Sequence, residues 1–421
     1  ARLATEGVVF EDLYAEALPT IPARKVYFTG RPLFPTWRVQ PFKGDPLSTQ
    51  PGWNPLPEDS VTLPEMAARR GVITGLITDV YHFFKPGQNL HRGWSSWQWI
   101  RGQEADRFRA GPRTVLAEAR QRVHLTEEDL SRSALPRGAA QYVLNTAGRS
   151  GEADYFVAQV MHEAADWLER HAGGALAEPP FLLWVDCFDP HEPWDPPSAD
   201  ADQYGPRAGE HEPIFASSAN WSTFTPAEQA RILALYRGEV TMVDRWIGHL
   251  LATLQRLGRE RDTAVLFLAD HGTILGEHGR LHKQPELLIA AETHLPFLLR
   301  LPKGAHAGQR VSGFLQAFDV TATILDILGV EERDGMRGRS ALELLDGRWN
   351  GRDAVLSAYR DYVSLRDRRW NCIVHREEGK VVGAPCLFDL TDGEAQDVAA
   401  QHPTIVHDYV GHIQLLASET A

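Results

Sequence analysis

A short apolar run over residues 264–269 ends abruptly in Asp270, His271 and Gly272. Its length and its content of Val, Leu and Phe are typical of a buried parallel strand, and open α/β sheets place their sites where such strands end. An Asp and a His side by side there offer a carboxylate oxygen and an imidazole nitrogen to one cation, while the Gly lets the backbone turn away. Taken alone, the dipeptide is equally compatible with a loop cap and a surface histidine.

A second apolar run, residues 180–187, ends in the same kind of polar cluster. Asp186, Asp189 and His191 lie at or just after its end, and the prolines at 190 and 193 would hold this loop rigid. The segment after His271 is also polar and includes Lys283. The repetition of carboxylate and imidazole groups at two strand ends predicts one shared site.

Helical and strand patterns alternate along most of the chain. Helices are predicted over residues 62–71, 153–171, 227–258 and 319–328, and further strands over residues 72–79 and 296–301. From about Gly335 the pattern changes to short strands closed by a helix over residues 403–417, which favours a small antiparallel sheet. We therefore expect a large α/β domain over residues 1–334 and a small α+β subdomain over residues 335–421.

Composition limits the partners of the chain. The 421 residues, 43% of them hydrophobic, are enough to bury a large core. The formal charge of -13 argues against a broad nucleic-acid or anionic-membrane surface, because both require a positive face. No apolar run reaches transmembrane length, and the sequence leaves room for a homo-oligomer.

The cysteines and the first residues bear on location and completeness. Three cysteines are too few for a disulfide framework, so a reducing, cytoplasmic location is expected, although Cys372 and Cys386 are still able to pair. The opening residues ARLATEGVVF lack an initiator Met and resemble a helix end that runs into a strand. We therefore expect an N-terminal piece to be missing.

Residues 17–31, ALPTIPARKVYFTGR, predict a capped helix. Thr20 is expected as the N-cap, Pro22 in the first turn and Gly30 as the stop. The free N–H groups and the dipole at such a helix start would also stabilise an anion beside the Thr20 hydroxyl. Arg24, one turn along, offers a planar fork of donors to the same anion.

Two further groups of residues allow more than one interpretation. His82 lies just beyond the strand over residues 72–79, where a lone His is more often structural than catalytic. The stretch from Arg92 to Arg109 is rich in Trp and Arg, and it includes Trp97 and Arg101. It fits a substrate-facing lid, and it fits equally well an ordinary loop in which Trp packs on Arg side chains.

Several separated motifs, in order, resemble the sulfatases of the alkaline phosphatase superfamily. They are ARLATEGVVFEDLYAEA, TIPAR with FTGR, DPHEPW, LADHGTILGEHG with Lys283, FDVTATILDILG, GRSALELL and CLFDLTDGE. The resemblance implies an α/β/α sandwich with a mostly parallel sheet, a smaller C-terminal antiparallel sheet with a helix, and a divalent metal at the carboxyl ends of the strands.

The resemblance also implies roles for individual residues. Asp270 and His271 match the metal-binding pair of the family, and Thr20 falls at the position of its Cys or Ser nucleophile. The other implied active-site residues are Arg24, His82, His191 and Lys283.

The chain departs from the family at the nucleophile. The family converts Cys or Ser to a formylglycine aldehyde, and Thr20 cannot form it because its β-carbon already bears a methyl group. No formylglycine is expected, so the Oγ of Thr20 itself would have to attack, and water would have to release the covalent ester. Relatives in the superfamily that use Thr directly act on phosphorus, which favours phosphorus esters here.

Two further departures concern residues near the metal. The family carries adjacent Asp ligands on its first strand, and no such strand precedes Ala1. A Lys expected shortly before His82 is also absent, with Asp79 nearby instead. Part of the metal shell is therefore expected to lie outside this sequence.

These observations predict a metal-dependent hydrolase of a small anionic ester, of the sulfatase or phosphodiesterase type. Thr20 is the expected nucleophile, phospho- or phosphonate esters are favoured over sulfate esters, and Arg92, Trp97 and Arg101 are expected to bind the substrate. A His beside an Asp suits zinc, manganese or iron better than calcium. The alternatives are a sulfatase that works without formylglycine and an inactive binding protein of the same fold.

Overall fold

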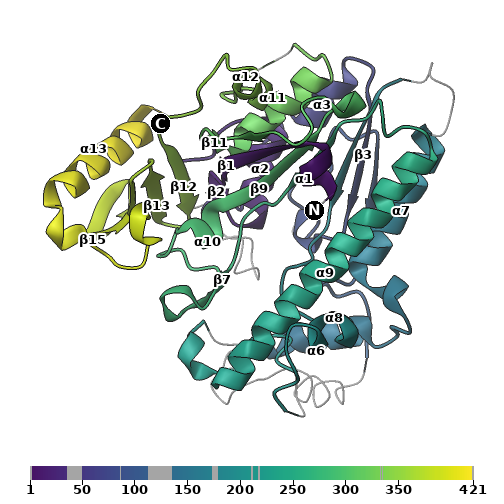
Figure 1. The fold of residues 1–421 in the computed structure, drawn as a ribbon, viewed down its shortest axis with the longest axis horizontal. Helices are drawn as coiled ribbons and strands as arrows, with labels where there is room; N and C mark the ends of the chain where they lie inside the picture. Colours follow the sequence, from purple (N-terminus) through teal and green to yellow (C-terminus); the bar gives the residue numbers. More distant parts are fainter. Residues whose placement is uncertain are drawn as a thin grey trace.

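The computed structural model describes residues 2–35, 50–85, 87–111, 135–172, 179–209, 212–216, 219–331, 333 and 335–419. Figure 1 shows an α/β core with the C-terminal lobe, drawn in yellow, at one side. The opening residues form helix α1 (Arg2–Glu6) and then strand β1 (Val8–Tyr14), so the expected helix-to-strand passage is confirmed.

The strands of the core belong to two larger sheets. The first has the order β10 (Arg310–Val311), β1, β9 (His294–Arg300), β6 (Val265–Leu268), with β11 (Leu315–Gln316) also paired to β1. The second has the order β4 (Ser96–Trp99), β3 (Ile73–Thr78), β5 (Phe181–Asp186), and all its pairs are parallel. β9 runs antiparallel to both β1 and β6, so the core is mixed but rich in parallel pairs.

Helices cover both faces of these strands. Alternate side chains of β5 face opposite clusters: Trp184 packs with the core around α2 (Thr20–Thr29), while Val185 packs against α7 (Phe156–Ala172). The α2 face also carries α3 (Leu63–Ala68) and α11 (Ala317–Ile327), and the α7 face carries the long α9 (Pro226–Arg256), as Figure 1 shows. The expected α/β/α arrangement is confirmed.

The prediction of fully buried strands at residues 264–269 and 180–187 was wrong in part. β6 and β5 do form there, but their side chains are mostly half-buried. Each of them pairs with a neighbour on one edge, and within the described ranges no strand pairs with the other edge. A strand paired on one side only keeps part of its surface open to solvent, which explains the lower burial.

Helix α2 begins at Thr20, not after it. Pro19 is the N-cap, because its carbonyl already accepts the first helical hydrogen bond from the Ala23 N–H at 3.2 Å. The expectation of Thr20 as a capping residue was therefore wrong, and its side chain lies in the first turn. The predicted stop is confirmed: Gly30 has a φ of 63° and donates its N–H to the Val26 carbonyl.

The C-terminal lobe is the expected antiparallel sheet with a helix. Its strands are β12 (Val355–Tyr359), β13 (Tyr362–Arg366), β14 (Trp370–Glu377) and β15 (Lys380–Asp389), and α13 (Pro403–Glu419) packs on them. The sequence did not reveal that β2 (Ala17–Leu18) joins this sheet parallel to β12. The lobe is therefore hydrogen-bonded to the segment that immediately precedes Thr20.

Cysteines and membrane segments can be assessed in the same part of the chain. Cys187, Cys372 and Cys386 are free thiols, so the pairing that the sequence left open between Cys372 and Cys386 is not formed. No described helix is long and apolar enough to cross a membrane.

Candidate active site

Arg24 joins the carboxyl ends of β5 and β6. Its guanidinium donates to both oxygens of Asp186, at 3.1 and 2.8 Å, and Nη1 donates to Asp270. The side chains of Arg24 and Asp186 are 8% and 7% exposed. Nη1 also lies 3.3 Å from the carbonyl of Thr20, so one buried cation ties the start of α2 to two strand ends.

Asp270 and His271 are arranged to offer two different ligands to one cation. His271 Nδ1 lies 2.7 Å from the Gly272 carbonyl, which makes Nδ1 the protonated nitrogen and leaves the lone pair of Nε2 free. Nε2 lies 3.3 Å from Asp270 Oδ2. Burial would raise the pKa of Asp270, but the charge of Arg24 and the hydrogen bonds from Arg24 and the His271 backbone N–H outweigh burial and lower this pKa to about 2. Burial lowers the pKa of His271.

This donor pair fits a divalent metal, because the carboxylate is ionised and the imidazole is neutral. The described residues supply two such ligands at this point, whereas a zinc site takes four ligands in all. Arg24 meanwhile donates to the Asp270 oxygen that faces His271. A metal bound here would therefore share Asp270 with Arg24 or displace the guanidinium from it.

Gly272 is needed for close approach and not for a special turn. A Cβ atom built on it would lie 2.1 Å from the carbonyl oxygen of Ala291, and no left-handed φ is present there. Its N–H donates to the Glu292 carbonyl at 2.7 Å. The residue that follows the Asp-His pair is thus fixed against the helix α10 (Ala290–Thr293).

Thr20 lies at the amino end of α2 and is 4% exposed. Within the described ranges its hydroxyl takes part in no hydrogen bond with another residue. The hydroxyl is therefore free of competing protein partners at a helix end whose N–H groups favour an anion.

Lys283, His191 and Glu192 form a second charged group beside the first. Lys283 Nζ lies 2.8 Å from His191 Nε2 and 3.2 Å from Glu192 Oε1. Burial lowers the pKa of His191 to about 4, so its imidazole is neutral and its Nε2 accepts a hydrogen bond from the Lys283 ammonium. Burial would lower the pKa of Lys283 as well, but the Glu192 carboxylate outweighs it and raises this pKa. The charge of Lys283 in turn acts on His271, which places the two groups together.

His82 is held by an acid and by aromatic rings. Its Nε2 lies 3.2 Å from Glu104 Oε2, and the rings of Trp53 and Phe188 pack on it with centroids 5.3 and 6.1 Å away. Burial would raise the pKa of Glu104, but the hydrogen bond and charge of His82 outweigh it and lower this pKa. His191 also lowers the pKa of Glu104, so His82 belongs to the same region as the Lys283 group.

The three predicted substrate-binding residues lie elsewhere. Arg92 pairs with Glu65 at the start of α3, and Trp97 is a 46% exposed residue of the edge strand β4. Arg101 pairs with Asp106, stacks 4.3 Å above the Trp99 ring and lines a cavity of about 520 Å³ at the end of β4. Within the described part of the chain, no hydrogen bond, ion pair or ring contact links these three to Thr20, so the structure does not bring them to the strand-end cluster.

Sequence reasoning missed Glu104 and Tyr359. Glu104 lies in a loop with no periodic pattern, and only its contact with His82 reveals it. Tyr359 ends β12 and reaches the region because β12 pairs with β2. Pairing between segments more than three hundred residues apart leaves no local signal in the sequence.

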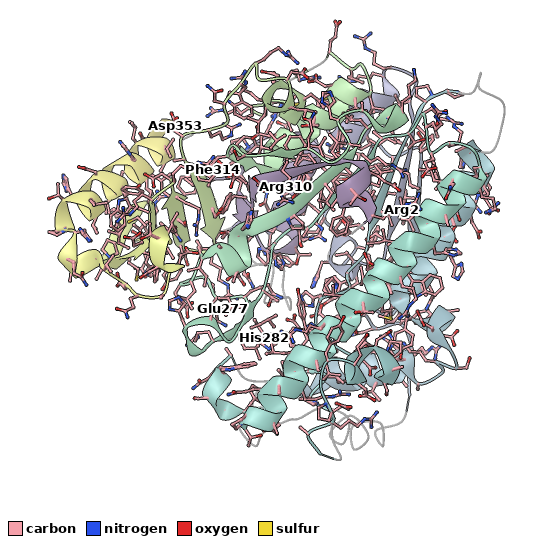
Figure 2. The ribbon with its side chains drawn as sticks, viewed as in Figure 1. Arg2, Glu277, His282, Arg310, Phe314 and Asp353 are labelled. Atoms are coloured by element: carbon pink, nitrogen blue, oxygen red, sulfur yellow. The ribbon has the colours of Figure 1, made fainter. Side chains whose placement is uncertain are left out.

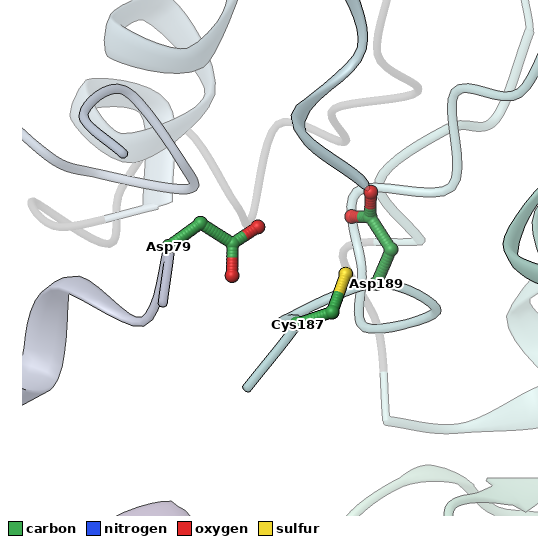
Figure 3. Close-up of side chains that lie close together, drawn as sticks. All are labelled: Asp79, Cys187 and Asp189. Carbon is green, nitrogen blue, oxygen red and sulfur yellow. The ribbon is translucent and has the colours of Figure 1, made fainter. Parts of the chain in front are cut away.

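A second carboxylate cluster lies behind the loop that carries His191. Figure 3 shows Asp79, Cys187 and Asp189 close together. Their ligand atoms lie within 4.8 Å of one another. The Gln103 amide donates to Asp189 at 2.7 Å and to Asp79 at 3.4 Å, and the Phe188 N–H donates to Asp79 at 2.7 Å.

This cluster is linked by hydrogen bonds between its loops. Burial raises the pKa values of Asp79, Asp189 and Cys187, and therefore favours their neutral forms. Metal ligands of these types must be deprotonated, so a metal bound here would have to displace their protons.

Comparison with known proteins gives a consistent result. The sequence model of the family described as Sulfatase matches residues 1–330. Arylsulfatase K of Danio rerio is 28% identical over 202 residues, which are 44% of this chain and 37% of the relative. The multifunctional alkaline phosphatase superfamily protein PehA of Trinickia caryophylli is 30% identical over 196 residues, 42% of this chain and 38% of the relative.

Solved structures extend the likeness over the whole fold. The crystal structure of the phosphonate monoester hydrolase of Agrobacterium radiobacter superimposes with a TM-score of 0.70 at 20% identity, covering 100% of this chain and 90% of that one. At this identity the likeness shows the fold. The chain spans only about half the length, or less, of the curated relatives named arylsulfatase K that it matches. Since the family model covers most of the sequence and the fold agrees, the protein belongs to the sulfatase family.

Proposed function

We propose that the protein is a metal-dependent hydrolase of phosphate or phosphonate esters in which Thr20 is the nucleophile. The observation that carries this proposal is the Thr20 hydroxyl at the amino end of α2, free of protein hydrogen bonds within the described part, beside the cluster of Arg24, Asp270 and His271. An ester anion at this helix end would meet N–H groups and positive charge together.

The metal would be held by Asp270 and His271, with further ligands from outside the described residues. An oxygen and a neutral imidazole nitrogen suit zinc, manganese or iron. When bound, such a metal lowers the pKa of a coordinated hydroxyl and stabilises negative charge on the ester oxygens.

In the first half of the reaction, Thr20 Oγ loses its proton to solvent and forms a bond to phosphorus. The bond from phosphorus to the leaving oxygen breaks, and the electron pair stays on that oxygen. Lys283 is the proton donor we favour for it, because its ammonium is stabilised by Glu192 while His191 is neutral. His191, which lies 2.8 Å from Lys283 Nζ, would orient Lys283, and His82 is the alternative donor.

In the second half, water releases the covalent ester. Water gives one proton to Lys283 and its oxygen bonds to phosphorus, while the bond from phosphorus to Thr20 Oγ breaks and Oγ regains a proton from solvent. The sum is the hydrolysis of one ester by one water. A sulfated Thr lacks the C–O cleavage route that a formylglycine hydrate has, which is why phosphorus esters are favoured.

The test is a hydrolysis panel of an aryl sulfate, a phosphate monoester, a phosphodiester and a phosphonate ester, with zinc, manganese or iron added in turn. Metal-dependent turnover of the phosphorus esters is expected. Dominant turnover of the aryl sulfate would favour the alternative of a sulfatase without formylglycine, in keeping with the arylsulfatase relatives. No metal uptake and no turnover of any ester would favour an inactive binding protein.

A further inference from the structure

The turn between β12 and β13 lies beside the nucleophile segment. The parallel pairing of β12 with β2 ends at Tyr359 opposite Leu18, two residues before Thr20. Tyr359 also pairs with Tyr362, so the two residues between them, Arg360 and Asp361, form a tight hairpin turn at that level. The C-terminal sheet thus delivers one turn to the wall of the candidate active site.

Tyr359 reaches this region with its hydroxyl available. The residue is 4% exposed, yet its hydroxyl makes no hydrogen bond within the described part of the chain and is not sealed from solvent. Burial raises the pKa of Tyr359, while Arg360 and Lys283 act in the opposite direction and Glu192 acts with burial. The phenol therefore lies near the Lys283 group, and its hydroxyl is unpaired within the described part of the chain.

Arg360 is an exposed residue of this turn with two described contacts. Its Nε donates to Gln50 at 3.3 Å, in the loop whose Trp53 packs on His82. Its guanidinium carbon lies 5.4 Å from the centroid of the Tyr359 ring, and the charge of Lys283 acts on Tyr359. Arg360 therefore contacts one residue from the His82 side and one from the Lys283 side of the candidate site.

Within the described part of the chain, Arg360 has no carboxylate in ion-pair contact. Arg24 pairs with Asp186 and Asp270, and Lys283 pairs with Glu192. Arg360 forms no ion pair among the described residues, although the chain as a whole carries a formal charge of -13. It also has a φ of 54°, a left-handed conformation that is unusual for Arg and that fixes the side chain at the turn.

We propose that Tyr359 and Arg360 form a subsite for an anionic substituent on the leaving group, so that the preferred ester carries a carboxylate in its organic part. This inference rests on the proposed function. A carboxylate there would accept a hydrogen bond from the Tyr359 hydroxyl and face the guanidinium of Arg360. A leaving group with a neutral substituent in this subsite would lose the attraction to the Arg360 charge, and its hydrogen bond with the Tyr359 hydroxyl would no longer be charge-assisted.

The test is a binding measurement that does not need turnover. Two phosphonates whose C–P bond this chemistry does not cleave, 4-carboxybenzylphosphonate and 4-carbamoylbenzylphosphonate, differ only in the charge of the distal group. Calorimetry with the metal-loaded protein should show about tenfold tighter binding of the carboxylate compound, as expected for one charge-assisted contact. The same preference should appear in kcat/KM for the matching pair of aryl phosphonate esters.

Three variants decide the origin of that preference. Arg360→Asn removes the charge but suits the left-handed turn, and the preference should vanish. Tyr359→Phe keeps the ring packing and should reduce the preference several-fold. Arg256→Asn is the control, and the preference should stay in this variant. Arg256 is an exposed residue in the last turn of α9 and pairs with Glu169. Because α9 ends just before the amino end of β6, Arg256 lies far from the carboxyl ends of the strands, where the candidate site is.

Equal affinity of the wild-type protein for both phosphonates, or no binding of either, would overturn the subsite. A preference that survives Arg360→Asn would overturn it too. A binding preference without hydrolysis of any ester would support the subsite and refute the proposed function, so the two failures are distinct.

Discussion

Replacing Arg24 by Met should destabilise the protein severely, and more at neutral than at acid pH. Arg24 is the buried partner of both Asp186 and Asp270, whose side chains are 7% and 21% exposed. Removing one member of a buried ion pair costs roughly 3–5 kcal/mol, against a total stability of roughly 5–15 kcal/mol for a typical protein. A loss of about 4 kcal/mol is therefore expected at pH 7.

The pH dependence follows from Asp270. Its pKa in the folded protein is about 2, against a reference value of 3.8. A lowered acid pKa contributes stability that is complete above the reference value and is lost as the pH falls toward 2, and this shift corresponds to about 2.4 kcal/mol. Without Arg24, burial would raise the pKa of Asp270. Below that raised value the difference between wild type and variant should narrow by about 1.4 kcal/mol per pH unit.

The assay is urea unfolding followed by Trp fluorescence, from pH 7 down to pH 3.5, in the presence of a chelator so that no metal competes for Asp270. Arg256→Met is the control, because its pair with Glu169 is solvent-exposed and should contribute at most about 1 kcal/mol. A loss below about 1 kcal/mol for Arg24→Met, with no dependence on pH, would show that Arg24 is not the clamp between the two strand ends.

Three further predictions concern single residues. Thr20→Val should change the free energy of unfolding by no more than about 1 kcal/mol, since the hydroxyl has no hydrogen-bond partner among the described residues. It should reduce kcat by at least about a thousandfold, whereas Thr20→Ser should stay active, and equal activity of the two variants would refute the role of Thr20. The pKa of His191 is about 4 in the folded protein, below the reference value of 6.5, so the Tm of the wild-type protein should fall as the pH drops from 6.5 to 4. His191→Gln should lose this dependence of Tm on pH, and an unchanged dependence would show that His191 is not its source. Gly272→Ala should cost at least about 2 kcal/mol in urea unfolding, because its Cβ would meet the Ala291 carbonyl. Gly151→Ala, with open space around it and an extended φ of -158°, is the comparison for steric crowding, and equal losses would argue against close approach.

Local patterns in the sequence predicted most of the elements. Residues 153–171, 227–258, 319–328 and 403–417 were all predicted as helices, and the structure has α7, α9, α11 and α13 there within a few residues. These segments have a strong helical period, or have Pro at their start or Gly just after their end, so their helical structure is decided by neighbours in the sequence.

Features that depend on distant contacts were not predictable in this way. The half-buried state of β6 depends on which strands flank it, and the apolar run over residues 264–269 carries no information about that. The position of Thr20 inside α2 depends on the Pro19 carbonyl. Tyr359 reaches the candidate site through the pairing of β12 with β2, which joins segments more than three hundred residues apart.

The candidate site was predicted only in part, because local patterns reveal some of its residues and distant contacts position the others. The sequence pointed to Asp270, His271, His191 and Lys283 because polar residues at strand ends are a local pattern, and the structure places them together. The sequence could not show that Arg24 donates its hydrogen bonds to the carboxylates of Asp186 and Asp270. Lys283 directly follows the hairpin of β7 (Ile274–Leu275) and β8 (Leu281–His282), whose labelled residues Glu277 and His282 lie between the C-terminal lobe and α9 in Figure 2.

The central claim is that Thr20 carries the transferred group, and peptide mass spectrometry tests it most directly. The metal-loaded protein would be mixed with an aryl phosphonate ester, quenched in acid within milliseconds and digested. The peptide that contains Thr20 should carry the mass of the phosphonyl group, and Thr20→Val should show neither the adduct nor turnover. Steady turnover by the wild-type protein with an unmodified Thr20 peptide, together with an active Thr20→Val variant, would contradict the account.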